Sequence, residues 1–199
     1  MAPDTADTTP SARQRELLEA AYDYVLTHGL SDLSLRPLAA AIGSSPRVLI
    51  FLYGSKDGLV RALLQRARAD QLALVDGASA TDDGGGLAPA VERLWAWLSA
   101  PERRRLLRLW AEAYARSLAD SEGPWVGFAR ATVTDWLAVL ADHQPPGERE
   151  AEAGAAGRTL ALAVLRGALL DLLATDDEPR VSGGVAAYVA TLRATADRH

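Results

Sequence analysis

The chain has 199 residues, of which 49% are hydrophobic and 24% are charged, so it can bury a core and does not read as a disordered segment. It has no cysteine, which excludes disulfides and thiolate chemistry, and its three histidines are too far apart in sequence for a metal-ligand motif. The longest apolar run, Leu160 to Ala174, is interrupted by two charges, and no signal peptide is visible. We therefore expect a soluble, cytoplasmic protein with no membrane contact, no metal and no cofactor.

Basic residues are concentrated towards the N-terminus. Residues 11–70 carry eight basic and six acidic side chains, whereas the whole chain has a net charge of −5. This asymmetry is typical of a protein with one DNA-binding end and an acidic body.

The first 76 residues predict a tail and four helices. Residues 1–10 are small, polar and Pro-containing, which indicates a disordered tail. A helix over 12–28 follows, with Ser11 and Gln14 as a capping-box pair. Ser34 begins a short helix over 35–42, and Ser45 begins another over 46–52 with proline at its first position. A longer helix follows over 56–76.

The rest of the chain also has helical periodicity. Glycine-rich residues 77–86 predict a flexible connection. Further helices are expected from Leu87, from Pro101 and from Gly123-Pro124, and two more over 148–174 and 180–197. No segment alternates with period two, so the expected fold is all-α. It comprises a helix-turn-helix domain over 11–55 and a regulatory and dimerisation domain over 56–199, joined by the helix 56–76.

The two short helices have the pattern of a helix-turn-helix, in which the second helix enters the major groove of DNA. Arg47 is suited to a bidentate contact with guanine, and Val48 to a thymine methyl group. Lys56, at the start of the next helix, is suited to a backbone phosphate.

At this point the sequence resembles the TetR family of transcriptional regulators. The resemblance rests on LSLRPLAAAIGSS (residues 33–45), on GSKDGL (residues 54–59) and on His28-Gly29-Leu30 at the end of the first helix. It implies a homodimer with two reading heads, and a C-terminal domain that binds a small molecule and thereby lowers DNA affinity.

The reading helix departs from the family pattern. The family usually has a tyrosine and a histidine there that contact phosphates, but this chain has Ile50 and Leu52, which cannot donate hydrogen bonds. Ile50 is expected in the core. Arg36 either contacts DNA or pairs with an acid such as Asp32. The expected DNA-binding residues are Ser34, Arg36, Ser45, Pro46, Arg47, Val48, Phe51, Tyr53 and Lys56.

All five tryptophans lie in the C-terminal half. Aromatic residues on the inward faces of three successive helices form either a large core or the lining of a pocket for a flat or apolar ligand. The expected ligand-binding residues are Trp95, Trp110, Tyr114, Ser117, Trp125, Phe128, Thr132 and Trp136.

The segment from Gly157 to Ala174 is apolar nearly all round, so it should be buried, partly as core and partly as a dimer seam. Arg166 and Asp171 interrupt it, and each needs a charged partner or a place at an interface edge. The expected dimer residues are Ala161, Leu165, Ala168, Leu172, Val185, Tyr188, Val189 and Leu192.

The sequence thus predicts a ligand-responsive DNA-binding repressor that acts as a homodimer on a pseudo-palindromic operator and is released by an apolar or aromatic small molecule. The alternative is a helical ligand-binding or adaptor protein whose DNA-binding head has degenerated. An enzyme is not expected, since no clustered histidines, phosphate-binding loop or catalytic triad can be placed.

Overall fold

The computed structural model describes residues 11–30, 32–79 and 85–196; the expected tail over 1–10 and residues 80–84 of the expected connection lie outside these ranges. All regular structure in the described residues is helical. The elements are α1 (Ala12–His28), α2 (Leu35–Ala41), α3 (Pro46–Tyr53), α4 (Lys56–Ser79), α5 (Leu87–Ser99), a 3-10 turn (Pro101–Arg103), α6 (Arg104–Ala119), α7 (Phe128–Asp142), α8 (Pro146–Glu150), α9 (Glu152–Thr175) and α10 (Glu178–Ala196).

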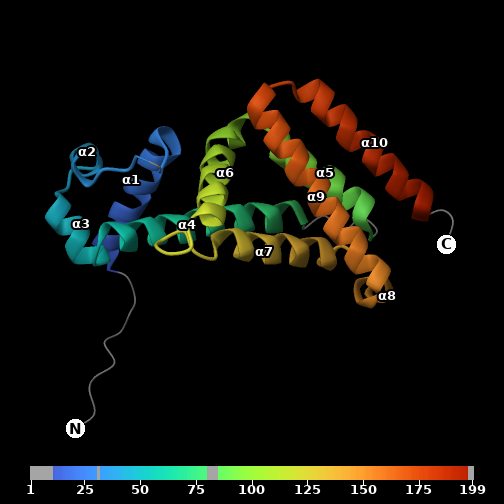
Figure 1. Ribbon diagram of the computed structural model, residues 1–199, viewed down its shortest axis with the longest axis horizontal. Coiled ribbons are helices and arrows are strands. Elements are labelled where there is room, and N and C mark those ends of the chain that lie inside the picture. Colours follow the sequence, from blue (N-terminus) through green and yellow to red (C-terminus); the bar gives the residue numbers. More distant parts are fainter. Residues whose placement is uncertain (1–10, 31, 80–84, 197–199) are drawn as a thin grey trace, which may run out of the picture.

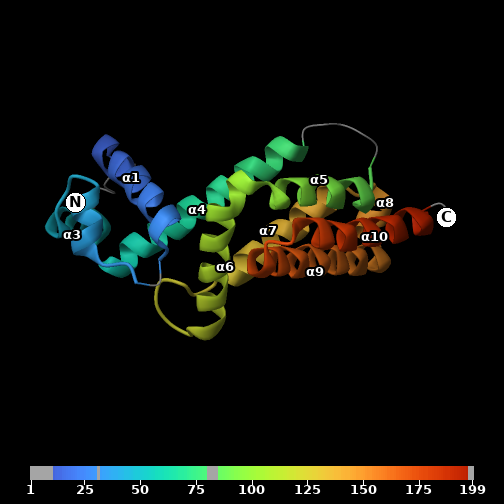
Figure 2. The ribbon, with the colours of Figure 1, turned by 90° about the horizontal axis from the view of Figure 1, so that it is seen from above.

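The molecule is elongated, with a small head at one end and a larger body at the other (Figure 1). Helices α1 to α3 and the start of α4 form the head. Helix α4 continues into the body, where it packs against α5 and α7. Seen from above, α5, α9 and α10 lie side by side in the body, and α6 crosses between body and head (Figure 2). The all-α fold with an N-terminal helix-turn-helix is therefore present.

Helix α1 is fixed to α4 by a polar clamp over a buried core. The Tyr22 hydroxyl donates to an Asp70 carboxylate oxygen at 3.2 Å, and the Arg66 guanidinium lies 4.8 Å from the centre of the Tyr22 ring. Arg66 also donates to Glu19 at 2.7 Å. Burial, and then the neighbouring carboxylate of Asp70, raise the pKa of the Tyr22 hydroxyl, so it stays a donor. This clamp makes the head and the first half of α4 one packed unit.

The helix starts predicted near the N-terminus are present, with one difference. Ser11 accepts a hydrogen bond from the Gln14 backbone at 3.1 Å, and Ser45 accepts one from the Val48 backbone at 3.3 Å. The Gln14 side chain does not complete a capping box, because its amide donates to the Leu52 carbonyl at 3.2 Å instead. A local cap has thus become a tertiary link between α1 and α3.

Three expected helix boundaries are wrong. Helix α4 continues to Ser79. Helix α7 begins only at Phe128, since Gly127 has a left-handed backbone with φ of 81°. The expected helix 148–174 is divided into α8 and α9 at Ala151, whose backbone is extended. Gly154 permits this break, because a Cβ there would lie 1.8 Å from the Glu148 carbonyl oxygen.

Most of the expected dimer residues belong to the core of the single chain. Leu165, Leu172 and Ala161 of α9 and Val185 and Val189 of α10 have no more than 3% of their surface exposed. They pack between α5, α9 and α10 and have no surface left for a partner, so their assignment to a dimer seam needs correction. Ala168, Tyr188 and Leu192 are partly buried. The large apolar side chains of α9 that are exposed are instead Leu160 and Leu170, at 55% and 53%.

Within the described ranges, no single helix is long and apolar enough to cross a membrane; α2 and α3, bent by 102° to one another, meet the length and composition test only when taken together.

The turn between α2 and α3 depends on Gly43, whose φ is 63°. A Cβ at this position would meet no atom within 4 Å, so only the left-handed backbone disfavours other residues. We expect Gly43→Ala to lower the free energy of unfolding by about 1–2 kcal/mol, and Gly43→Asn by less, because asparagine tolerates this region. Urea unfolding of the two variants checks this; equal losses would contradict it.

Candidate DNA-binding face and effector cavity

Helix α3 lies at the outer end of the head and presents an exposed face (Figure 1). Its Leu49 is 1% exposed and enters the head core, whereas Val48 and Phe51 are 40% and 86% exposed. Ile50, expected in the core, is 38% exposed. Arg47, in the first turn, is exposed and makes no ion pair with any described residue. The exposed face of α3 is therefore apolar, with one free cation at its start.

Tyr53 has a structural role that the sequence did not indicate. Its hydroxyl donates to the Gln14 carbonyl at 2.8 Å, opposite the bond from the Gln14 side chain to Leu52. Burial raises the pKa of this hydroxyl. Tyr53 was expected among the DNA-binding residues, but in this structure its hydroxyl donor fixes α3 against α1.

A shallow hollow brings several of the expected contacts together. It is lined by Ser34 and Arg36 at the start of α2, by Pro46 at the start of α3 and by Lys56 at the start of α4, with Asp32, Leu33 and Leu35 beside them. Neither Arg36 nor Lys56 makes an ion pair with a described residue, so Arg36 does not pair with Asp32. Two free cations bordering one hollow suit an anionic group.

The Ser45 and Ser34 hydroxyls differ in the hydrogen bonds that they make to the helix that follows. Ser45 accepts from the Val48 backbone, which leaves its own hydroxyl hydrogen free to donate. Ser34 makes no capping hydrogen bond with its side chain. Both are exposed; Ser34 lines the hollow, and Ser45 directly precedes Pro46, which also lines it.

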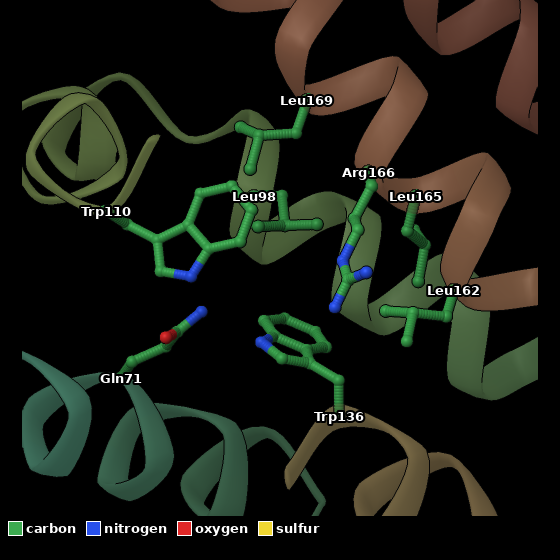
Figure 3. A pocket seen from close by; sticks show the side chains of 8 residues that line it. All are labelled: Gln71, Leu98, Trp110, Trp136, Leu162, Leu165, Arg166 and Leu169. Carbon is green, nitrogen blue, oxygen red and sulfur yellow. The ribbon is translucent and has the colours of Figure 1, made fainter. Parts of the chain in front are cut away.

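In the body, a narrow cavity of about 10 Å³, with room for little more than one water molecule, lies where five helices meet. Its walls come from α4, α5, α6, α7 and α9, and Figure 3 shows the polar ends of the lining side chains directed towards the same space. The lining residues are Gln71, Leu98, Trp110, Trp136, Leu162, Leu165, Arg166 and Leu169.

Two of the eight expected ligand residues, Trp110 and Trp136, line this cavity. Tyr114 lies behind it, with its ring 5.0 Å from the Trp110 ring. The sequence did not assign Gln71 or the four leucines to a ligand site, and it placed one of those leucines, Leu165, at the dimer seam. Arg166 was noticed only as a charge within an apolar helix.

The other five expected residues have structural contacts elsewhere. Trp95 donates to Ser182 at 2.8 Å and so joins α5 to α10. The Ser117 hydroxyl accepts from the Ala129 backbone N–H at 3.0 Å, and the Thr132 hydroxyl donates to the Ala129 carbonyl. Trp125 is buried just before α7, and Phe128 borders a separate hollow beside α4. None of these five lines the cavity: Trp95 links α5 to α10, and the other four lie on or beside α7.

Two structural links join the cavity to the head. The first is α4, which carries Gln71 in the cavity wall and Leu59 in the head core. The second is Glu112 of α6, whose carboxylate accepts from the Leu30 backbone at 3.1 and 3.2 Å, directly after α1. Trp110 lies two residues from Glu112 on α6. The cavity walls of α4 and α6 are therefore each joined to the head, one by a continuous helix and the other by a pair of hydrogen bonds.

No protein-family model and no curated protein sequence matches the chain. Solved structures do match. A protein from Rhodococcus sp. assigned to the TetR family is 18% identical, with a TM-score of 0.71 over 92% of this chain and 99% of that one. A TetR transcription regulator from Haloarcula marismortui is 19% identical, with a TM-score of 0.65 over 90% and 96%.

The fold is that of the TetR-family regulators. A third similar structure with this fold is the multidrug binding protein EbrR in complex with imidazole, which is 24% identical, with a TM-score of 0.65 over 94% of this chain and 96% of that one. EbrR has also been solved with proflavin. These matches cover both head and body, so the similarity of fold is not limited to the helix-turn-helix.

The bond from Leu30 to Glu112 should contribute to stability. We expect Glu112→Ala to lower the free energy of unfolding by about 1–3 kcal/mol, because the buried Leu30 N–H loses its acceptor. Glu122→Ala removes an exposed carboxylate with no ion partner in the described residues and should change stability by less than about 0.5 kcal/mol. Thermal unfolding of both variants checks this; equal melting temperatures would contradict it.

Proposed function

We propose that the protein is a ligand-responsive transcriptional repressor in the cytoplasm, which binds a pseudo-palindromic operator as a homodimer and leaves it when a small molecule binds. The observation that carries this proposal is the arrangement of free cations on the head. Arg47, Arg36 and Lys56 surround the exposed starts of α2, α3 and α4, and α4 runs from there into the wall of the effector cavity.

In this proposal α3 enters the major groove. Arg47 contacts a guanine edge, and the exposed Val48 and Phe51 meet apolar base surface such as a thymine methyl group. Pro46, Ser34, Ser45, Arg36 and Lys56 lie where the sugar-phosphate backbone passes, with the hydroxyls and cations as donors.

The homodimer would form through the outer face of α9. Its exposed residues Ala156, Leu160, Ala163, Gly167, Leu170 and Ala174 recur at alternating spacings of four and three, as in a coiled-coil seam. Small residues let a second helix approach closely, and the two leucines supply apolar area. Two-fold pairing would hold two reading heads at a fixed distance, which suits an inverted repeat.

Effector release would act through the cavity. At about 10 Å³ it is far smaller than most ligand sites, so a ligand must displace its walls, which include α4 and α6. A ligand that favours the opened walls shifts the population towards a head spacing that no longer fits DNA. The multidrug-binding relative EbrR, solved with imidazole and with proflavin, supports ligand binding in this fold.

A second candidate is an adaptor with a degenerate head. It is favoured by the apolar middle of α3, where Ile50, Phe51 and Leu52 offer no hydrogen-bond donor side chain. An adaptor would not need Arg47 or Lys56.

Operator binding separates the two candidates. Sites are selected from a randomised duplex library, and the anisotropy of the best site is measured with wild type, Arg47→Ala and Lys56→Ala across salt. We expect an inverted repeat. Loss of Arg47 should cost about 1–3 kcal/mol and relax one base position. Loss of Lys56 should weaken all sequences and reduce the salt slope by about 1.

Arg130→Ala is the matched control for these variants, since it removes an exposed cation from α7 in the body and should leave DNA affinity unchanged. If no sequence is enriched even at low salt, the head is not a DNA reader and the adaptor takes its place.

The dimer seam is tested by Leu160→Glu and Leu170→Glu. Each places a carboxylate in the proposed seam, so each should raise the dimer dissociation constant at least about tenfold. Ala138→Glu adds the same charge to the exposed side of α7 and should leave the dimer intact. Sedimentation at micromolar concentration measures all three; a wild type that is monomeric there would overturn the seam.

A further inference from the structure

Arg166 is a half-buried cation in the middle of α9 with most of its donors unused. Its Nη1 donates to the Tyr114 hydroxyl at 3.1 Å, and its guanidinium carbon lies 5.1 Å from the centre of the Tyr114 ring. Its Nε and Nη2 are buried without a hydrogen-bond partner. No carboxylate in the described part of the chain forms an ion pair with Arg166, whereas Asp171, on the same helix, is held by Arg180 at 2.7 Å.

This environment is unfavourable for a lone guanidinium. Burial lowers the pKa of Arg166, and the nearby Tyr114 hydroxyl only partly offsets that effect. An arginine nevertheless keeps its charge in proteins, so loss of a proton does not relieve the cost of burying it. A buried charge without a counterion is costly, which indicates that Arg166 is completed by something outside the described chain.

The two free nitrogens of Arg166 are the pair that holds a carboxylate. In the same protein, Arg68 donates from Nε and Nη2 to the two carboxylate oxygens of Asp135, at 2.5 and 2.7 Å. Nε and Nη2 present two parallel N–H bonds, and this fork matches a carboxylate in bidentate fashion. Arg166 offers the same fork towards the cavity.

The rest of the cavity fits an apolar body. Trp110, Trp136 and four leucines form the walls, and the Trp110 indole N–H is a further buried donor without a partner. Figure 3 shows the Arg166 guanidinium and the Gln71 amide directed into the space between the two indole rings. The cavity thus offers donors at one place and hydrocarbon around it.

We infer that the effector is a small organic acid, with an aromatic or short aliphatic body between Trp110 and Trp136 and its carboxylate held by Nε and Nη2 of Arg166. This inference rests on the proposed function for its regulatory meaning, but binding of the acid does not require it. The acid enters next to Gln71 of α4 and Trp110 of α6, the two helices that lead to the head.

The test compares acids with their neutral amides. Benzoate, phenylacetate and octanoate are each titrated against benzamide, phenylacetamide and octanamide, by calorimetry and tryptophan fluorescence, with the full-length wild-type protein. At least one acid should bind, and it should bind at least about 30-fold more tightly than its amide, because only the acid supplies a charge to the buried guanidinium.

The variants locate the charge. Arg166→Gln should abolish the preference for the acid, and Arg166→Lys should retain part of it. Arg180→Gln removes a surface arginine and should leave the preference unchanged, so it is the matched control. If Arg166→Gln fails to fold, the comparison of acid with amide on wild type still decides.

Three results would overturn the inference: no acid in the panel binds at millimolar concentration, amides bind as tightly as acids, or Arg166→Gln binds acids as wild type does. Each leaves the repressor intact if an operator is still selected. Conversely, a protein that binds the acids through Arg166 but selects no operator keeps this site and loses the proposed regulatory role. With both activities present, the bound acid should lower operator affinity in the anisotropy assay.

Discussion

The position of α4 in two cores at once is the constraint on which the rest of the structure depends. Leu59 and Leu63 of this helix are fully buried, and the Tyr22, Arg66 and Asp70 clamp fixes its next turns to α1. Gln71 then lies in the cavity wall. Leu59 and Gln71 are twelve positions apart, which is about 18 Å of continuous helix. A helix is stiff over this length, so the head follows the direction that the body gives to α4.

Helix α9 also belongs to more than one part of the structure: one face packs into the core, one lines the cavity and one is exposed to solvent. Ala161 and Leu172 fill the core. The cavity is lined by Leu162, Leu165, Arg166 and Leu169. Leu160 and Leu170 face solvent. This explains why the helix is apolar nearly all round. It also explains why hydrophobicity alone could not separate its core residues from those available to a second copy.

The sequence was sufficient where the signal is local. The caps at Ser11 and Ser45 and the left-handed turn at Gly43 follow from individual residues and their near neighbours, and so the head was predicted closely. Prediction failed where a contact outside the helix's own pattern decides. Gln14 caps no helix because Leu52 lies beside it, and the division of α8 from α9 depends on the approach of Glu148 to Gly154.

The cavity was only partly predictable for the same reason. Aromatic side chains on helical faces identify a buried layer, but which of them border a space depends on how five helices meet. Trp95 and Trp136 look alike in sequence, yet the first is tied to Ser182 and the second lines the cavity. A charge within an apolar helix was the better indication of a cavity residue. Asp171 pairs with Arg180 at the surface, whereas Arg166 lines the cavity with two nitrogens that have no hydrogen-bond partner.

The narrowness of the cavity has a kinetic consequence. A ligand cannot diffuse into a space whose walls are already in contact, so its arrival waits for the side chains and helices around it to open, a motion of microseconds to milliseconds. The same closure delays departure. Under the proposed function, such a regulator would bind its effector more slowly than collision allows and release it more slowly, so its DNA occupancy would average over brief changes in effector concentration.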